Sequence, residues 1–244
     1  MYCLLDIEHT VYLFLYRFTI RFDNKNQIRN DKGDQFMITM RDVHKRYDNG
    51  SIALNGINIH IDKGEFVYIV GPSGAGKSTF VKLMYREVKP TSGQLTIDNV
   101  DVYGMKEKEV PYLRRKIGVI FQDFKLLPKL SVYENVAFAL EVIEESPRHI
   151  RNRVMEVLDL VGLKNKARSM PYELSGGEQQ RVTIARAIVN NPKIVIADEP
   201  VTALDVIVQH QVLSTLKRLK EELNLTIILI THDMGVIADM ADKV

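Results

Sequence analysis

The stretch Gly71–Thr79, GPSGAGKST, has the spacing G-x-x-x-x-G-K-S of loops that bind nucleotide phosphates. It directly follows an apolar run typical of a buried strand and opens a predicted helix, which is the context that the motif requires. Gly74 and Gly76 let the backbone turn its amides toward phosphate oxygens, and the helix N-terminus adds positive potential. Lys77 can reach the β- and γ-phosphates, and the Ser78 hydroxyl can bind Mg²⁺. The residues that we expect to contact the nucleotide are Gly71, Pro72, Ser73, Gly74, Ala75, Gly76, Lys77, Ser78 and Thr79.

The run IVIADE, residues 194–199, ends a predicted strand in two acids. An acidic strand end is common by itself, but beside a phosphate-binding loop it predicts the other half of a hydrolytic site. We expect Asp198 to hold Mg²⁺ from its outer coordination sphere. We expect Glu199 to be the general base that polarises the attacking water.

A third stretch, LSGGEQQ at residues 174–180, places Ser175, Gly176 and Gly177 just before another predicted helix. A helix start of this kind also receives anions, because its first backbone amides are unpaired. Ser-Gly-Gly alone is an ordinary loop, whereas the whole heptapeptide shortly before the acidic strand end is highly specific.

The elements that must position these residues alternate along the chain. Apolar runs predict strands at residues 52–61, 65–71, 116–122, 193–200 and 225–231, and helical spacing predicts helices at residues 77–86 and 206–223. Residues 89–98 predict a turn and an edge strand. Strands that alternate with helices indicate a mainly parallel sheet with helices on both faces. A helical pattern over about 123–180 interrupts the alternation and predicts an inserted helical subdomain.

Composition narrows the class of protein. The 244 residues carry a net charge of +2, which gives no bulk argument for nucleic acid, and we expect no direct nucleic-acid partner. Cys3 is the only cysteine, so no disulfide can form within the chain. Residues 11–20 are apolar but contain Arg17, and they are shorter than the roughly 20 residues that span a bilayer. A strand or a flexible apolar tail is the favoured interpretation of that segment.

From about Met37 onward, these motifs make the chain similar to the ATP-binding cassette (ABC) ATPases. The resemblance implies a P-loop NTPase cassette fold, with an N-terminal antiparallel β part beside the parallel sheet, and ATP with Mg²⁺ as its ligands. It divides the chain into an N-terminal extension at residues 1–36, either poorly ordered or not translated, and a cassette at residues 37–244. The cassette would be incomplete at its C-terminus.

The resemblance also implies roles for single residues. Tyr47 stands where the family stacks an aromatic ring on adenine. Gln122 would touch Mg²⁺ or the lytic water and relay nucleotide occupancy to a membrane partner. His232 would contact the γ-phosphate, and Asp205 would lie at a dimer interface. Each of these residues, taken alone, is also compatible with an ordinary structural role.

In this family the LSGGQ-type loop of one subunit caps the ATP that is held by a second subunit. The resemblance therefore implies a head-to-tail homodimer or ABC heterodimer, with Ser175, Gly176 and Gly177 acting in trans. Glu178 and Val201 replace the Gln and Thr that are usual in the family. Valine is nearly isosteric with threonine but lacks the hydroxyl, and we expect catalysis to survive this change.

Two subfamilies are represented along the chain. Residues 37–200 resemble the FtsE-type cell-division ATP-binding proteins, which pair with the membrane protein FtsX. Residues 201–244 resemble the ATPases of oligopeptide and dipeptide importers, which pair with a peptide permease. Either resemblance implies a transmembrane partner and a peripheral position at the cytoplasmic face of the plasma membrane. Alternatives of another class are a soluble ABC mechanoenzyme and a nucleotide-binding module that does not hydrolyse ATP.

Overall fold

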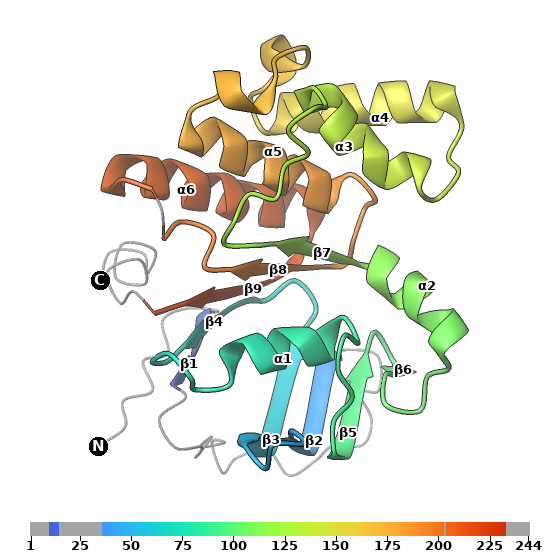
Figure 1. Ribbon diagram of the computed structural model, residues 1–244, viewed down its shortest axis with the longest axis vertical. Coiled ribbons are helices and arrows are strands. Elements are labelled where there is room, and N and C mark those ends of the chain that lie inside the picture. Colours follow the sequence, from blue (N-terminus) through green and yellow to red (C-terminus); the bar gives the residue numbers. More distant parts are fainter. Residues whose placement is uncertain (1–9, 15–35, 203, 233–244) are drawn as a thin grey trace.

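The computed structural model describes residues 10–14, 36–202 and 204–232. Its centre is a parallel sheet of five strands in the order β1–β4–β9–β8–β7 (Figure 1). The strands are β1 (Thr10–Phe14), β4 (Phe66–Val70), β7 (Ile117–Ile120), β8 (Ile194–Asp198) and β9 (Thr226–Thr231). The predicted parallel sheet is confirmed, and its apolar strands are buried on both faces, as parallel strands usually are.

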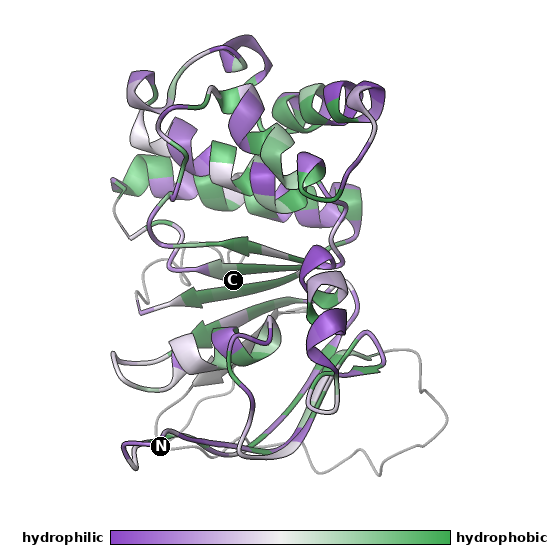
Figure 2. Ribbon diagram, turned by 45° about the vertical axis from the view of Figure 1, so that its right-hand side comes forward, coloured by the Kyte–Doolittle hydropathy of each residue, from purple (hydrophilic) through white to green (hydrophobic). Residues whose placement is uncertain are grey.

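Side chains of β4 alternate between two hydrophobic cores. Phe66, Tyr68 and Val70 point into a core shared with the helical side of the molecule, while Val67 and Ile69 point into a core shared with a second sheet. This alternation follows from the period of two along a strand. Figure 2 shows the consequence, because the strands of the central sheet are coloured as the most hydrophobic elements.

The second sheet is antiparallel, with the order β3–β2–β5–β6. Its strands are β2 (Phe36–Arg46), β3 (Ile52–Asp62), β5 (Ser92–Ile97) and β6 (Val100–Asp101). The antiparallel part is confirmed, but the prediction of an edge strand within residues 89–98 is wrong. β5 pairs with β2 on one side and with the two-residue β6 on the other, and so short an edge strand leaves no pattern in the sequence. The helix α1 (Lys77–Met84) lies between the two sheets (Figure 1).

The opposite face of the parallel sheet is covered by helices. The long helices α5 (Gly176–Ile188) and α6 (Val206–Leu223) lie nearest the sheet, and α3 (Val132–Glu141) and α4 (Pro147–Leu160) lie farther out (Figure 1). The short α2 (Val110–Arg115) leads into β7. The helical pattern predicted over 123–180 corresponds to α3, α4 and α5. The first of these helices begins at Val132, and the last continues to Ile188.

Polar caps explain where four of the helices begin. Ser131, Ser146, Ser175 and Asp205 each accept a hydrogen bond from a backbone amide of the first helical turn, at α3, α4, α5 and α6 respectively. Such caps satisfy amides that have no partner within the helix. No helix among the described residues is both long and apolar enough to cross a membrane.

Both ends of the chain were the subject of predictions. β1 pairs in parallel with β4 at the edge of the central sheet, so part of the apolar segment 11–20 forms a strand. The rest of the predicted extension 1–36, and the predicted incompleteness after residue 232, lie outside the described residues apart from Phe36, where β2 begins.

Candidate functional site

The phosphate-binding loop follows β4, and two glycines shape it. Gly74 and Gly76 have φ of 80° and 91°, in the left-handed region that favours glycine. At Gly76 a Cβ would lie 2.4 Å from the backbone oxygen of Ala53. Any side chain at position 76 would therefore push the loop away from β3. Gly76 is also the N-cap of α1, which begins at Lys77 directly beyond the loop.

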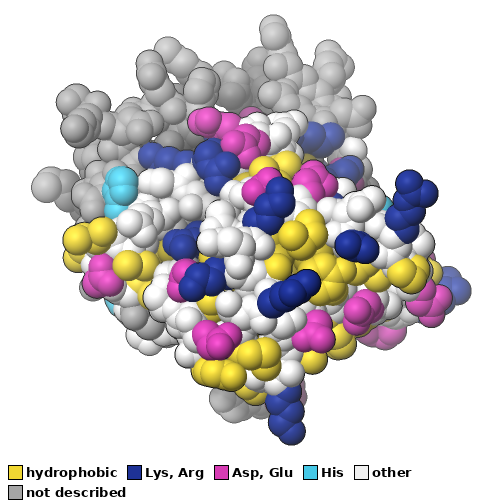
Figure 3. Space-filling view, turned by 90° about the horizontal axis from the view of Figure 1, so that it is seen from above, with side chains coloured by type: hydrophobic (Ala, Val, Ile, Leu, Met, Phe, Trp, Pro, Cys, Tyr) yellow, Lys and Arg dark blue, Asp and Glu magenta, His cyan; other side chains and the backbone are white. Residues whose placement is uncertain are grey.

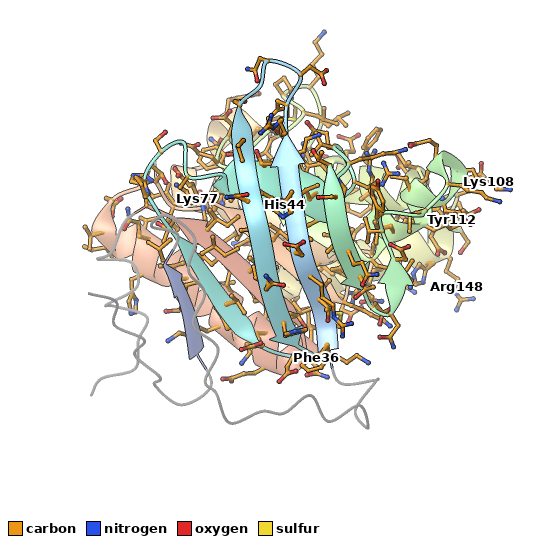
Figure 4. The ribbon with its side chains drawn as sticks, turned by 90° about the horizontal axis from the view of Figure 1, so that it is seen from below. Phe36, His44, Lys77, Lys108, Tyr112 and Arg148 are labelled. Carbon is orange, nitrogen blue, oxygen red and sulfur yellow. The ribbon has the colours of Figure 1, made fainter. Side chains whose placement is uncertain are left out.

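Lys77 folds back over the loop that precedes it. Its ammonium donates hydrogen bonds to the carbonyl oxygens of Gly71 (2.6 Å) and Pro72 (3.0 Å), and the residue is buried. Seen from the side of the antiparallel sheet, Lys77 lies closer to the end of β2 that carries His44 than to the end at Phe36 (Figure 4). A cation fixed at this point faces any phosphate that the loop amides hold.

Tyr47 lies beside the same loop. Its hydroxyl is 3.1 Å from Oγ1 of Thr79, and the Lys45 ammonium lies 5.1 Å from the centre of its ring. The tyrosine that the family resemblance assigns to adenine is therefore adjacent to the first turn of α1. An aromatic ring beside the phosphate-binding loop suits the base of a nucleotide whose phosphates the loop holds.

The two acids stand at the carboxyl end of β8. Burial and the neighbouring charge of Glu199 raise the pKa of Asp198, while the positive charges of Lys77 and Lys125 oppose that rise. Asp198 is therefore within electrostatic range of Lys77, the lysine of the phosphate-binding loop. Lys125 was missed in the sequence, where it carries no motif of its own.

Glu199 is held in an unusual backbone conformation. Its φ is 48°, and its amide donates to the carbonyl oxygen of Ile230 in β9 (2.9 Å). Its Oε1 lies 3.0 Å from Nδ1 of His232, the residue that follows β9. Parallel pairing of β8 with β9 brings these two residues to one edge of the sheet, as expected for strand ends in an open α/β sheet.

Gln122 follows β7 and lines a cavity of 460 Å³ between its loop and the helical subdomain. The guanidinium of Arg186 on α5 donates to the carbonyl oxygens of Phe124 (3.2 Å) and Lys125 (2.8 Å), which ties the loop to that subdomain. The other lining residues are Asp123, Phe124, Lys125, Leu126, Pro128, Pro171, Tyr172 and Gln179. Gln122, which the family resemblance assigns to Mg²⁺ or the lytic water, therefore lines this surface groove.

The predicted trans-acting segment lies elsewhere in the chain. Ser175 caps α5 in a reciprocal pair with Glu178, and Gly176 and Gly177 pack so tightly against Leu204 and Val208 that a Cβ would lie 2.9 Å and 2.5 Å from them. Among the described residues, no hydrogen bond joins Ser175–Gly177 to the phosphate-binding loop. Asp205 caps α6 by accepting from the amide of Val208 (3.0 Å).

The structure therefore brings together one set of the predicted residues and leaves a second set apart. Tyr47, Lys77, Asp198, Glu199 and His232 surround the phosphate-binding loop or the adjoining strand ends. Ser175, Gly176, Gly177 and Asp205 form a separate cluster around the start of α5 and α6. This division is what a site completed by a second copy would require.

Comparison with known proteins gives a consistent picture. Residues 54–202 match the family model described as "ABC transporter". The cell division ATP-binding protein FtsE of Bacillus subtilis is 59% identical over 208 residues, which cover 85% of this chain and 91% of that protein. The methionine import ATP-binding protein MetN of Helicobacter hepaticus is 44% identical, over 85% of this chain and 59% of that protein.

A solved dimer of the ATP-binding cassette MJ0796, in a post-hydrolysis state with ADP and Pi, superposes with a TM-score of 0.72. It is 40% identical and covers 83% of this chain and 91% of the MJ0796 chain.

Proposed function

The chain belongs to the ABC transporter family of ATPases, and on that premise we propose that it is the ATP-hydrolysing subunit of an FtsE-type cell-division complex. The observation that carries the proposal is the contact between Glu199 and His232, beside Asp198 and opposite Lys77. A carboxylate placed next to a phosphate-binding loop is the arrangement that activates water against a γ-phosphate.

The chemistry proposed for the site divides among a few groups. The loop amides and Lys77 bind the phosphates and neutralise the charge that develops during transfer. Glu199 accepts a proton from the attacking water, and His232 holds that carboxylate while facing the γ-phosphate. Tyr47 stacks on the adenine, so affinity does not depend on hydrogen bonds to the base.

Mg²⁺ is the proposed metal. Ser78, Gln122 and Asp198 offer oxygen atoms, the ligand type that Mg²⁺ prefers. The carboxylate of Asp198 fits a cation as well, because burial and the adjacent charge of Glu199 raise its pKa and a positive ion would offset both effects. When bound, Mg²⁺ neutralises charge on the β- and γ-phosphates.

Two copies are proposed to share two nucleotides, head to tail. Ser175, Gly176 and Gly177 of one copy would place the start of α5, with the amides of the two glycines, against the ATP on the other, with Asp205 nearby. The cassette MJ0796, to which this chain is similar over most of its length, forms a dimer. The separation of these residues from the phosphate-binding loop of their own chain supports this arrangement.

An FtsX-like membrane protein is the proposed partner, which would hold the chain at the cytoplasmic face of the plasma membrane. The groove lined by Gln122 and Tyr172 is the proposed contact, since Gln122, a proposed Mg²⁺ contact, lines it together with the exposed Tyr172. Tyr172 is 78% exposed at its rim. Figure 3 shows that the outer face of the helical subdomain carries exposed hydrophobic groups among side chains of both charges.

An importer subunit is the second candidate. It is favoured by the segment after Pro200, which resembles peptide-importer ATPases, and by the similarity to the importer ATPase MetN. The two candidates share the hydrolytic chemistry and differ in the membrane protein that they bind.

Co-purification from membranes distinguishes them. The tagged chain should capture an FtsX-like protein, and Tyr172→Ala should weaken the capture. Tyr112→Ala is the matched control, because Tyr112 is also exposed (63%) but belongs to α2 and does not line the groove. Capture of a peptide permease instead, or equal capture by both variants, would contradict the proposed partner or the proposed groove respectively.

A further inference from the structure

The carboxylate of Glu199 has a second partner besides His232. The hydroxyl of Thr202 lies 3.3 Å from Oε2 of Glu199 and 3.4 Å from its carbonyl oxygen. His232 contacts the other carboxylate oxygen, Oε1. The two oxygens are therefore held by different groups, which fixes the rotation of the carboxylate about its last bond.

Glu199 needs such support because its backbone is strained. A φ of 48° is uncommon for a residue with a side chain, and strain of this kind persists only where the surroundings enforce it. The amide of Thr202 lies 3.4 Å from the carbonyl oxygen of Glu199, so a tight turn begins at the strained residue itself. Thr202 is thus placed by the same turn that it stabilises.

The turn is braced on its far side by Gln209 of α6. The side-chain amide of Gln209 donates to the carbonyl oxygens of Val201 (3.1 Å) and Leu204 (3.0 Å). Val201 is 2% exposed and belongs to the hydrophobic core beneath α5 and α6. Leu204 packs against the glycine at the start of α5. These contacts hold the position of Thr202 without involving its hydroxyl.

We propose that Thr202 is a positioning residue for ATP hydrolysis: its hydroxyl orients the Glu199 carboxylate toward the attacking water, and Gln209 holds the turn that presents it. The proposal rests on the proposed role of Glu199 as general base. It gives the unusual segment after Pro200 a function. Val201 serves only as a core residue, so the missing hydroxyl at position 201 is harmless, whereas the hydroxyl at position 202 is required.

Paired substitutions test the proposal. Thr202→Val removes the hydroxyl at constant shape and should lower kcat about tenfold, the value of one typical hydrogen bond, with KM for ATP unchanged. Thr202→Ser keeps the hydroxyl, and its kcat should stay within about twofold of the parent value. Val201→Thr, one residue away, is the matched control and should leave kcat unchanged. Equal thermal unfolding midpoints for Thr202→Val and Thr202→Ser exclude a folding defect as the cause of their difference.

A double-substitution cycle links the effect to Glu199. If Thr202 acts through that carboxylate, Thr202→Val should cause no further loss of residual turnover in a Glu199→Gln background. An equal loss in both backgrounds, an unchanged kcat in Thr202→Val, or an equal defect in Thr202→Ser would overturn the proposal. If Glu199 is not the general base, the result is distinguishable from these outcomes, because Glu199→Gln alone would then retain full turnover.

Discussion

His232 and Glu199 meet at the carboxyl edge of the parallel sheet, with the imidazole Nδ1 3.0 Å from the carboxylate Oε1. The Glu199 side chain is 18% exposed and that of His232 is 50% exposed, so the carboxylate sits inside and the imidazole covers it. Neighbouring parallel strands create this contact, because Asp198 pairs with Ile230, and Glu199 and His232 lie one and two residues beyond that pair.

The contact predicts the effect of His232→Ala. Loss of a hydrogen bond to a charged group should lower kcat for ATP by about 10- to 100-fold. His210→Ala is the control, since His210 is an exposed residue of α6 and should leave turnover unchanged. Steady-state phosphate release measures both. Equal turnover in the two variants would show that the imidazole does not support the carboxylate.

The stability of the helical face depends on Gly118. A Cβ at this position of β7 would lie 2.4 Å from the carbonyl oxygen of Ala187 in α5. Gly118→Ala should therefore lower the free energy of unfolding by about 1–3 kcal/mol, the cost of overpacking a tight contact. Denaturant unfolding gives the value. Adding Ala187→Gly should not restore stability, since the clash is with backbone, and full restoration would contradict the geometry.

Asp98 predicts a pH dependence of stability. Burial opposes its ionisation, but hydrogen bonds from Lys193 (2.8 Å) and Lys116 (3.2 Å) outweigh burial and lower its pKa. A carboxyl whose pKa is lower in the folded state stabilises the fold above its unfolded pKa of 3.8, and this contribution is lost as pH falls through the folded pKa. Asp98 links the antiparallel sheet to the starts of β7 and β8.

Asp98→Asn tests this, because asparagine tolerates the positive φ of 48° at position 98. The variant should lose about 1 kcal/mol of unfolding free energy near neutral pH. The difference from the parent should shrink below about pH 4, where the carboxylate becomes protonated. Asp159→Asn is the control, as Asp159 pairs with Lys164 at an exposed site. A difference that stays constant with pH would contradict the ion-pair account.

Local patterns in the sequence predicted much of this molecule. Helix α6 begins and ends at the predicted residues 206 and 223, since an apolar stripe runs along the whole helix and Asp205 caps it. The buried strands were predicted for a similar reason, because a parallel strand covered on both faces must be apolar throughout.

Features that depend on distant contacts could not be predicted. The ion pairs of Asp98 join residues that are far apart in the sequence, and β6 is too short to leave a pattern. The positive φ of Glu199 and the hydroxyl contact of Thr202 arise from a turn that the buried Val201 anchors. The sequence motifs identify the residues that we propose to bind the nucleotide, whereas the way they are held depends on tertiary packing.

Turnover by Glu199→Gln tests the central claim most directly. Glutamine keeps the shape of the side chain but cannot accept the proton of the attacking water. Steady-state ATP hydrolysis should fall about 100-fold or more, while ATP still binds and a nucleotide-bound dimer accumulates on size exclusion. Turnover equal to that of the parent protein would remove Glu199 from the role of general base and would contradict the mechanism built on it.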